Sequence, residues 1–256
     1  MEDAFSDNFA LLRKVPNGVR KTGDNIDKKV PDPSVARRSS EALCMLEFLG
    51  RMMGFSLRWK HYLPYDFPPI VWKLLLEAEP DENDLLAIDV QAYSRIKQLR
   101  QCESKESFEL EFPGLTFLCE DSTGVERELF SGQGHRAVKF EERKLYADKA
   151  IEMRLQEFNV GVDAIRKGLQ ACVPARTLRL FTWRELEQLC CGDPLVDAAY
   201  LRQHTQYSSG YAEDHAVIQR FWRVFDTLAN QDRSDFVRFA WGRARLPRPE
   251  HFTTPL

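Results

Sequence analysis

Hydrophobic residues recur at helical spacing along the first third of the chain. After Ser39 or Ser40, either of which can cap a helix, apolar side chains follow every third or fourth position, at Leu43, Leu46, Leu49, Met52 and Met53. Pro68 and Pro69 fit the first turn of a second helix, which Ile70 to Leu76 continue. A shorter apolar stripe predicts a third helix around residues 88–99.

The same period returns in the second half of the chain. The spacing of six apolar residues predicts one long helix, and they are Ile151, Leu155, Phe158, Val162, Ile165 and Leu169. Thr182 and Glu185 form a capping box ahead of Leu186 and Leu189. Asp214 is positioned to cap a helix with apolar residues from Ile218 to Phe225, and a last helix around Phe236 and Phe239 stops at Gly242.

Between these helical regions the period changes to two. Phe108, Leu110 and Phe112 alternate with charged residues, and a second alternating run over residues 115–119 follows the Pro113–Gly114 pair. This pattern predicts two strands joined by a turn, with a short third strand near residues 138–140 closing a small sheet. Helix dominates nevertheless, so we expect an α+β fold that is mainly α.

Two segments break the regular pattern. Residues 1–38 are rich in Lys, Arg, Asp, Asn and Pro without a sustained period, which predicts an irregular arm. Gly192, Asp193 and Pro194 interrupt the chain sharply, and we expect a hinge or domain boundary there.

Composition narrows the functional classes. Hydrophobic residues make up 43% and charged residues 29%, and 36 basic against 39 acidic residues give a net charge of −3, which does not suggest nucleic-acid binding. No apolar run reaches the roughly 18 residues that a membrane span needs, and the acidic N-terminus lacks a signal-peptide core. We therefore expect a protein of a reducing compartment, the cytoplasm or also the nucleus.

No motif in the chain carries an obvious chemistry. The six cysteines form no CxxC pair, and the five histidines stand singly, so the sequence predicts neither a metal nor a cofactor. Gly132-Gln133-Gly134 is not followed by the Lys-Ser/Thr pair of a phosphate loop. Cys172, Cys190 and Cys191 lie in apolar surroundings that favour inert thiols.

Several segments in a fixed order nevertheless carry a resemblance to a known family. They are Met45–Gly54 with Ser56–Arg58, Leu63–Lys73, Arg166–Leu169 before Val173–Pro174, Glu185–Leu189 before Cys191–Gly192, Thr205–Tyr207, Gly210–Tyr211, Phe221–Trp222 and Gly242–Pro247. Taken together over residues 11–249, they resemble the HECT domain of E3 ubiquitin-protein ligases. The Trp241–Pro247 segment is similar to that of the large HERC-like members.

The resemblance implies a domain organisation. Residues 39–191 would form the HECT N-lobe, with 88–146 as the subdomain that binds the conjugating enzyme and 1–38 as an incomplete start. Residues 192–194 would be the hinge and 195–256 the first part of a C-lobe, loosely packed because its core partners would be missing. In the subdomain, Ile96, Phe112 and Tyr146 fall where the family has apolar groove residues, although the family usually has Asn where Glu142 stands. Ordinary core packing is the alternative for each.

The resemblance also implies a function. A HECT ligase accepts ubiquitin from a conjugating enzyme as a cysteine thioester and passes it to a lysine of a protein substrate. The family's cysteine follows a Leu-Pro…Thr segment a few dozen residues after the equivalent of Pro247, so we expect it beyond Leu256. The chain alone would then bind the conjugating enzyme without transferring ubiquitin. A non-catalytic adaptor, or a purely structural helical fragment with a degenerate groove, remains the alternative.

Overall fold

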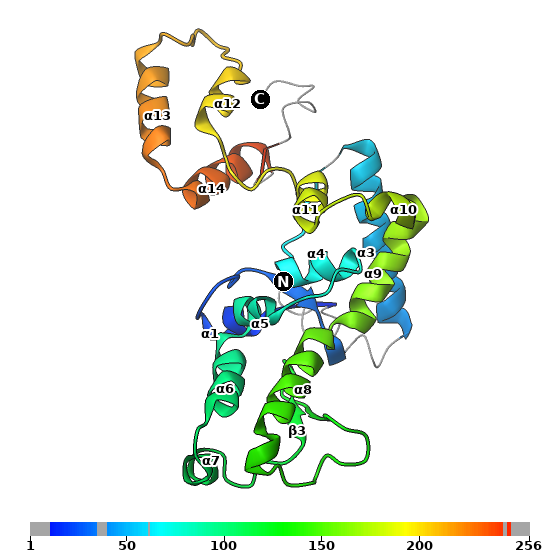
Figure 1. The fold of residues 1–256 in the computed structure, drawn as a ribbon. Coiled ribbons are helices and arrows are strands. Elements are labelled where there is room, and N and C mark those ends of the chain that lie inside the picture. Colours follow the sequence, from blue (N-terminus) through cyan, green and yellow to red (C-terminus); the bar gives the residue numbers. More distant parts are fainter. Residues whose placement is uncertain (1–10, 35–39, 61, 243–244, 247–256) are drawn as a thin grey trace, which may run out of the picture. The chain divides into compact units, whose positions relative to one another are not determined.

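The computed structural model describes residues 11–34, 40–60, 62–242 and 245–246, which divide into two compact units. The first unit takes in the chain up to Met52 and Asp66–Trp183, and the second takes in Met53–Tyr65 and the chain from Arg184 onward. Both are mainly helical, and the described strands form two small antiparallel sheets, β1–β2 and β3–β4 (Figure 1). The expected fold class, α+β and mainly α, is thereby confirmed.

The first unit begins with more regular structure than the sequence predicted. β1 (Leu12–Lys14) pairs with β2 (Lys29–Pro31), and α1 (Pro16–Arg20) lies between them. These elements are too short to show a period, which explains why residues 1–38 were expected to be irregular. The buried Asn17 ties this start to the body of the unit, since its side-chain amide donates to the carbonyl of Ala87 (3.1 Å) and its oxygen accepts from the amide of Val90 (2.8 Å). Residues 1–10 and 35–38 of that expected arm lie outside the described residues.

Two long helices form the body of the first unit. α3 (Ser40–Trp59), whose last turns belong to the second unit, crosses α9 (Asn159–Cys172) at two glycines. A Cβ at Gly50 would stand 1.8 Å from the carbonyl oxygen of Ile165, and one at Gly168 would stand 1.8 Å from that of Glu47. Because any side chain would collide with backbone there, only glycine permits this crossing. α4 (Pro69–Leu75), predicted from its two prolines, packs against α9, and the short α10 (Ala175–Leu178) follows.

The long helix predicted over residues 151–169 is two helices. α8 (Arg143–Gln156) ends and α9 begins on either side of Glu157 and Phe158, so the prediction of a single helix was wrong. The apolar spacing runs through the break because Leu155, Phe158 and Val162 are all buried. At the break, Glu157 is buried too, and its side chain accepts a hydrogen bond from the backbone of another segment, as described below.

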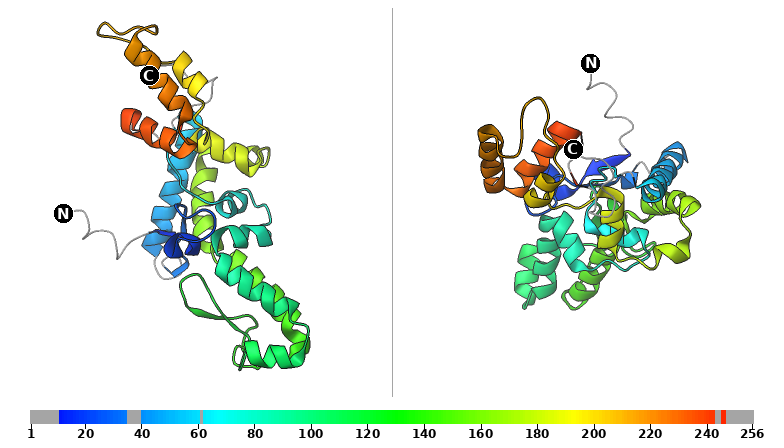
Figure 2. Two further views of the ribbon diagram at one scale, coloured as in Figure 1. Left: turned by 90° about the vertical axis from the view of Figure 1, so that its left-hand side faces the viewer. Right: turned by 90° about the horizontal axis from the view of Figure 1, so that it is seen from above.

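A subdomain of short elements, coloured green in Figures 1 and 2, lies at one end of the first unit. It comprises α5 (Glu82–Ile88), α6 (Val90–Gln101), α7 (Lys105–Glu111), β3 (Leu118–Glu120), β4 (Glu126–Glu128), the 3-10 turn η1 (Phe140–Glu142) and α8. α6 confirms the helix predicted around residues 88–99, whereas α5 was not predicted. The capping box of Asp81 and Asp84 is the signal that marks its start.

The predicted strand over residues 108–112 is helical, which corrects that prediction. Ser104 caps α7 by accepting a hydrogen bond from the amide of Ser107 (3.1 Å), and Phe108 and Phe112 then face the core one turn apart. The second predicted strand is confirmed only in part: β3 includes Leu118 and Cys119 of that run and extends to Glu120, and it pairs with β4 instead of with residues 108–112. No strand forms over residues 138–140: Thr116 bridges to Ala137 alone, and Phe140 begins η1.

The second unit has its own apolar core. α11 (Trp183–Cys191), α12 (Ala198–Gln203), α13 (Ala216–Thr227) and α14 (Asn230–Trp241) supply most of its helical structure. Val196, Leu201, Trp222, Phe225 and Val237 are among the residues buried together there. Among the described residues from Leu195 to Leu246, buried side chains of α12, α13 and α14 therefore form a small core, and the expected loose packing of the partial C-lobe stays a prediction.

The ends of α13 and α14 test two further predictions. His215, not Asp214, caps α13: its Nδ1 accepts from the amide of Val217 (3.2 Å). α14 ends at Gly242 with φ at +73°, as predicted. Across the described ranges, no helix combines the length and apolarity that crossing a membrane requires.

Candidate functional site

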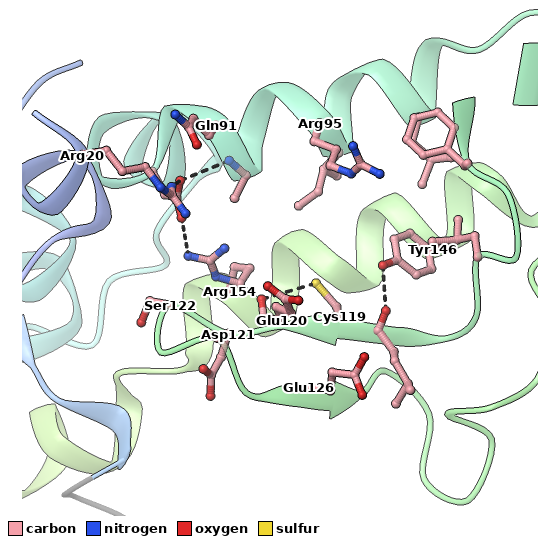
Figure 3. Close-up of a pocket in the computed structure, with 18 residues that line it drawn as sticks. Arg20, Gln91, Arg95, Cys119, Glu120, Asp121, Ser122, Glu126, Tyr146 and Arg154 are labelled. Carbon is pink, nitrogen blue, oxygen red and sulfur yellow. Dashed lines mark hydrogen bonds and ion pairs between the residues drawn. The ribbon is translucent and has the colours of Figure 1, made fainter. Parts of the chain in front are cut away.

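A cavity of about 560 Å³ opens in the green subdomain of the first unit (Figure 3). α6 and α8 form two of its sides and the β3–β4 hairpin forms another. Its apolar lining consists of Ala92, Ile96, Leu99, Phe112, Leu115, Leu118 and Tyr146. Charged side chains of both signs surround this lining, among them Arg20 and Arg95 on one side and Glu120 and Glu126 on the hairpin.

The structure brings together the three residues that the resemblance placed in a groove. Ile96 comes from α6, Phe112 ends α7 and Tyr146 comes from α8, and all three line this one cavity. Their side chains are nevertheless largely buried, with 7%, 5% and 7% of their surface exposed. They therefore form the floor of the cavity, while Leu115 and Leu118 are the half-buried apolar residues nearer its opening.

The Tyr146 side chain both bonds to the β3–β4 hairpin and packs against the residue before it. Its hydroxyl donates to the carbonyl of Leu118 (2.8 Å), and its ring packs against Phe117 with the ring centres 6.0 Å apart. Burial raises the pKa of Tyr146, and the neighbouring thiol of Cys119 raises it further. The phenol therefore stays neutral and acts here as a hydrogen-bond donor.

A chain of buried ion pairs closes one end of the cavity. Asp89 caps α6 and accepts hydrogen bonds from Arg20 (2.6 Å) and from Arg154 (2.9 Å). Arg154 also stands 3.4 Å from Glu157, whose carboxylate accepts the amide of Ser122 in the hairpin turn (2.8 Å). Because Asp89, Arg154 and Glu157 are almost fully buried, each charge depends on its partners for compensation.

Asp121 organises the hairpin turn. It accepts hydrogen bonds from the hydroxyl and the amide of Thr123 (2.8 Å for the amide) and from Arg127 (3.0 Å). Although burial alone would raise the pKa of Asp121, these hydrogen bonds outweigh it and hold that pKa below its ordinary value.

None of these turn and network residues was expected from the sequence. The available signals were Asp89 at the start of a helical stripe and Glu157 inside an apolar one. Burial of these carboxylates cannot be read from the order of residues, since Asp89 bonds to Arg20 and Arg154, and Glu157 bonds to the amide of Ser122, all distant along the chain.

The six cysteines differ in their surroundings. Cys102, Cys190 and Cys191 are buried, and Cys191 donates to the carbonyl of Tyr65 (3.7 Å). Cys119 lines the cavity, and burial raises its pKa to about 11. Among the described residues, no group of three or more His, Cys, Asp or Glu side chains has a geometry that could hold a metal ion.

The predicted hinge lies within the second unit. Gly192 adopts a φ of +85°, and the amide of Asp193 donates to the carbonyl of Leu246 (3.1 Å). Arg245 reaches the carbonyl of Gly192 (3.4 Å) and the carboxylate of Glu187 (3.0 Å). This is the geometry of the segment in one conformation, so a hinge at residues 192–194 stays a prediction.

Comparison with known proteins identifies the family. Residues 1–253 match the model of the HECT domain (ubiquitin-transferase). The chain is 34% identical to E3 ubiquitin-protein ligase HERC2 of Mus musculus and of Homo sapiens over 238 residues, which is 93% of this chain and 5% of each HERC2. It is 29% identical over 271 residues to probable E3 ubiquitin-protein ligase HECTD4 of Homo sapiens, covering 98% of this chain and 7% of that protein. The chain therefore belongs to the HECT family, and it spans only a small fraction of the length of these relatives.

Proposed function

We propose that this chain is the part of a HECT E3 ubiquitin ligase that binds the ubiquitin-conjugating enzyme, and that it does so at the cavity between α6, α8 and the β3–β4 hairpin. The observation that carries this proposal is the convergence of Ile96, Phe112 and Tyr146 on one cavity, although they come from three different helical segments. In the complete protein, ubiquitin would pass from the conjugating enzyme to a cysteine of the ligase as a thioester, and then to a substrate lysine.

The lining of the cavity suits a protein partner that offers an apolar side chain within a charged surface. Leu115 and Leu118 provide half-buried apolar contacts, and the rim carries Arg95, which is exposed, opposite the exposed Glu120 and Glu126. A buried apolar contact surrounded by polar groups is the usual anatomy of a protein interface. Charged groups at the rim contribute mainly to orientation and association rate.

We also propose that none of the six cysteines is the nucleophile that receives ubiquitin. A reactive thiol needs exposure and a neighbour that stabilises the thiolate. Cys102, Cys190 and Cys191 are buried, burial raises the pKa of Cys119 to about 11, and Cys172 donates to the carbonyl of Arg51 (3.7 Å). Cys44 is exposed, but it belongs to a surface whose lining is apolar apart from the carboxylate of Glu41.

The binding proposal is tested with a panel of conjugating enzymes and the whole chain. We expect at least one member to bind measurably, and Leu115→Asp to weaken that binding about tenfold or more, because it places a charge at the apolar opening. Leu180→Asp is the matched control, since Leu180 is 79% exposed and does not line the cavity. Equal loss in both variants, or no binding by any member of the panel, would contradict the proposal.

The thiol proposal is tested with activating enzyme, a conjugating enzyme that binds, ATP and ubiquitin. We expect no ubiquitin adduct on this chain that a reductant removes. A reductant-sensitive adduct that maps to one of the six cysteines by mass spectrometry would show that this part of the proposal is wrong.

A further inference from the structure

We infer that Tyr146 and Glu157 are positioning residues that clamp the β3–β4 hairpin against α8 at both of its ends, and so fix the wall of the cavity that a partner meets. This inference rests on the proposed function, because it assigns these two side chains a role in shaping the binding surface. Neither residue needs to contact the partner. Figure 3 shows both α8 and the hairpin along the same cavity.

The hairpin is too small to hold its own position. Each strand has three residues, paired Leu118 with Glu128, Cys119 with Arg127 and Glu120 with Glu126. An isolated two-stranded hairpin is only marginally stable in water. Its place in the subdomain must therefore come from bonds to neighbouring elements.

The first clamp acts at the start of β3. The Tyr146 hydroxyl donates to the Leu118 carbonyl (2.8 Å), a bond that is shielded from water because the ring is 7% exposed. The base of the hairpin is also held through backbone bonds, from the Phe117 amide to the Arg136 carbonyl (3.1 Å) and from the Leu129 amide to the Phe117 carbonyl (2.9 Å).

The second clamp acts at the turn. The Glu157 carboxylate accepts the Ser122 amide (2.8 Å), directly beyond the end of β3. Arg154 neutralises Glu157 and in turn contacts Asp89, the cap of α6. The turn is thus connected through buried charges to the helix on another side of the cavity. In Figure 3 this chain of contacts runs from Arg20 to Arg154 beside Ser122.

The two clamps act on opposite ends of β3. Tyr146 and Glu157 are eleven residues apart, about 16 Å along a helix at 1.5 Å per residue. Glu157 itself keeps near-helical backbone angles, φ −58° and ψ −25°. Leu118 is the first residue of β3, and Ser122 lies in the turn, two residues beyond the end of that strand. The two bonds therefore hold the hairpin at the first residue of β3 and at the turn that follows it.

The clamped wall carries side chains of the cavity. Leu118, Cys119, Glu120 and Glu126 all belong to the hairpin and line the cavity. If the hairpin shifts, the opening changes even though Ile96 and Phe112 stay in place.

The experiment compares Tyr146→Phe, Glu157→Gln and the double variant with the wild-type chain. Tyr146→Phe removes one hydroxyl and keeps the ring, and Glu157→Gln keeps a carbonyl acceptor for Ser122 but removes the charge that Arg154 compensates. Glu152→Gln, on the exposed side of α8, is the control for the loss of a carboxylate. Amide hydrogen exchange reports hairpin anchoring, and titration with a conjugating enzyme reports binding.

We expect each single variant to bind the conjugating enzyme about threefold to tenfold more weakly, because Tyr146→Phe loses one buried hydrogen bond and Glu157→Gln replaces a charge-assisted acceptor of the Ser122 amide, which also faces Arg154, by a neutral one. The amides of Ser122 and Leu129 should exchange faster, while those of α6 and α8 keep their protection. Faster exchange with unchanged affinity would overturn the inference. Weaker binding with unchanged exchange would also overturn it, because the side chains would then contact the partner directly.

The outcome separates this inference from the proposed function. If the wild-type chain binds no conjugating enzyme, the proposed function fails, and the exchange rates of Ser122 and Leu129 still decide whether the clamps exist. If the wild-type chain binds and both variants bind equally well, the proposed function stands and the inference fails.

Discussion

At Gly50 and Gly168 the absence of a side chain allows α3 and α9 to cross with backbone against backbone. We expect Gly50→Ala to lower the free energy of unfolding by about 1–3 kcal/mol or more, because the added methyl group must displace the carbonyl of Ile165. Urea denaturation followed by circular dichroism measures the change. Val160→Ala, at a 42% exposed position of α9, should stay within about 0.5 kcal/mol of the wild type. An equally small effect at Gly50 would mean that the helices can move apart.

Asp121 links the stability of the hairpin turn to pH. Its folded-state pKa is depressed, so the unfolded chain binds more protons over the pH range between the two pKa values. The stabilisation is therefore complete above the unfolded value of about 3.9 and is lost as pH falls through the folded value. We expect Asp121→Asn to be less stable than the wild type at about pH 7, with the difference shrinking at about pH 3. Urea denaturation of both proteins at several pH values tests this, with the exposed Asp27→Asn as control. A difference that stays constant with pH would contradict it.

Cys119 offers a chemical probe of the cavity. Since burial raises its pKa to about 11, its thiolate should be scarce at neutral pH. We expect a maleimide to label Cys119 much more slowly than the exposed Cys44, with a rate that rises about tenfold per pH unit up to about pH 10. Peptide mass spectrometry after timed labelling distinguishes the two. The urea-unfolded chain is the control, in which both should react at similar rates, and fast labelling of Cys119 in the folded chain would contradict the assignment.

At the scale of elements, the sequence predicted best those helices that pack one regularly spaced apolar face against a single core. α3, α4, α6 and α14 were predicted from apolar spacing, with a Ser cap for α3, prolines at the start of α4 and Gly242 at the end of α14, and those signals are local. The prediction of a strand over residues 108–112 was wrong, because three alternating apolar residues also fit one and a half turns of a helix. Ser104, which caps α7, was the signal that could have decided between them.

The site residues were predictable only in part, and for a physical reason. Ile96, Phe112 and Tyr146 came from the resemblance, and the structure shows that they share a cavity. The sequence did not predict a site role for Glu157, Arg154 or Asp89. Whether a buried charge is stabilised depends on the partners that the fold brings next to it. The break between α8 and α9 at Glu157 could not be predicted from the sequence either, since the apolar spacing continues through it.

The start of α7 gives a prediction at this scale. We expect Ser104→Ala to destabilise α7 by about 1 kcal/mol, because the amide of Ser107 loses its side-chain acceptor. Hydrogen exchange at the amides of Ser107 and Phe108 should increase, with little change in α8. Ser94→Ala, at an exposed position of α6, is the matched control. Unchanged exchange at Ser107 would mean that Phe108 and Phe112 alone hold the helix.

At the scale of the whole molecule, the proposed binding cavity and the predicted hinge lie in different units. All residues that line the cavity belong to the first unit. The second unit has a separate core around Trp222 and Phe225, and it contains the predicted hinge. If the conjugating enzyme binds as proposed, it binds to the first unit, and the core of the second unit should fold independently of that binding.

This separation can be tested with a substitution in the core of the second unit. We expect Trp222→Ala to cost about 3–5 kcal/mol, because the ring is 3% exposed and its indole nitrogen donates to the Tyr207 hydroxyl (2.8 Å). The second unit should then unfold at lower urea concentration, while affinity for the conjugating enzyme stays within about twofold of the wild type. Val224→Ala, on the same helix but 55% exposed, is the control for a surface change in that unit. If affinity falls together with the stability of the second unit, the cavity depends on both cores, and binding cannot be assigned to the first unit alone.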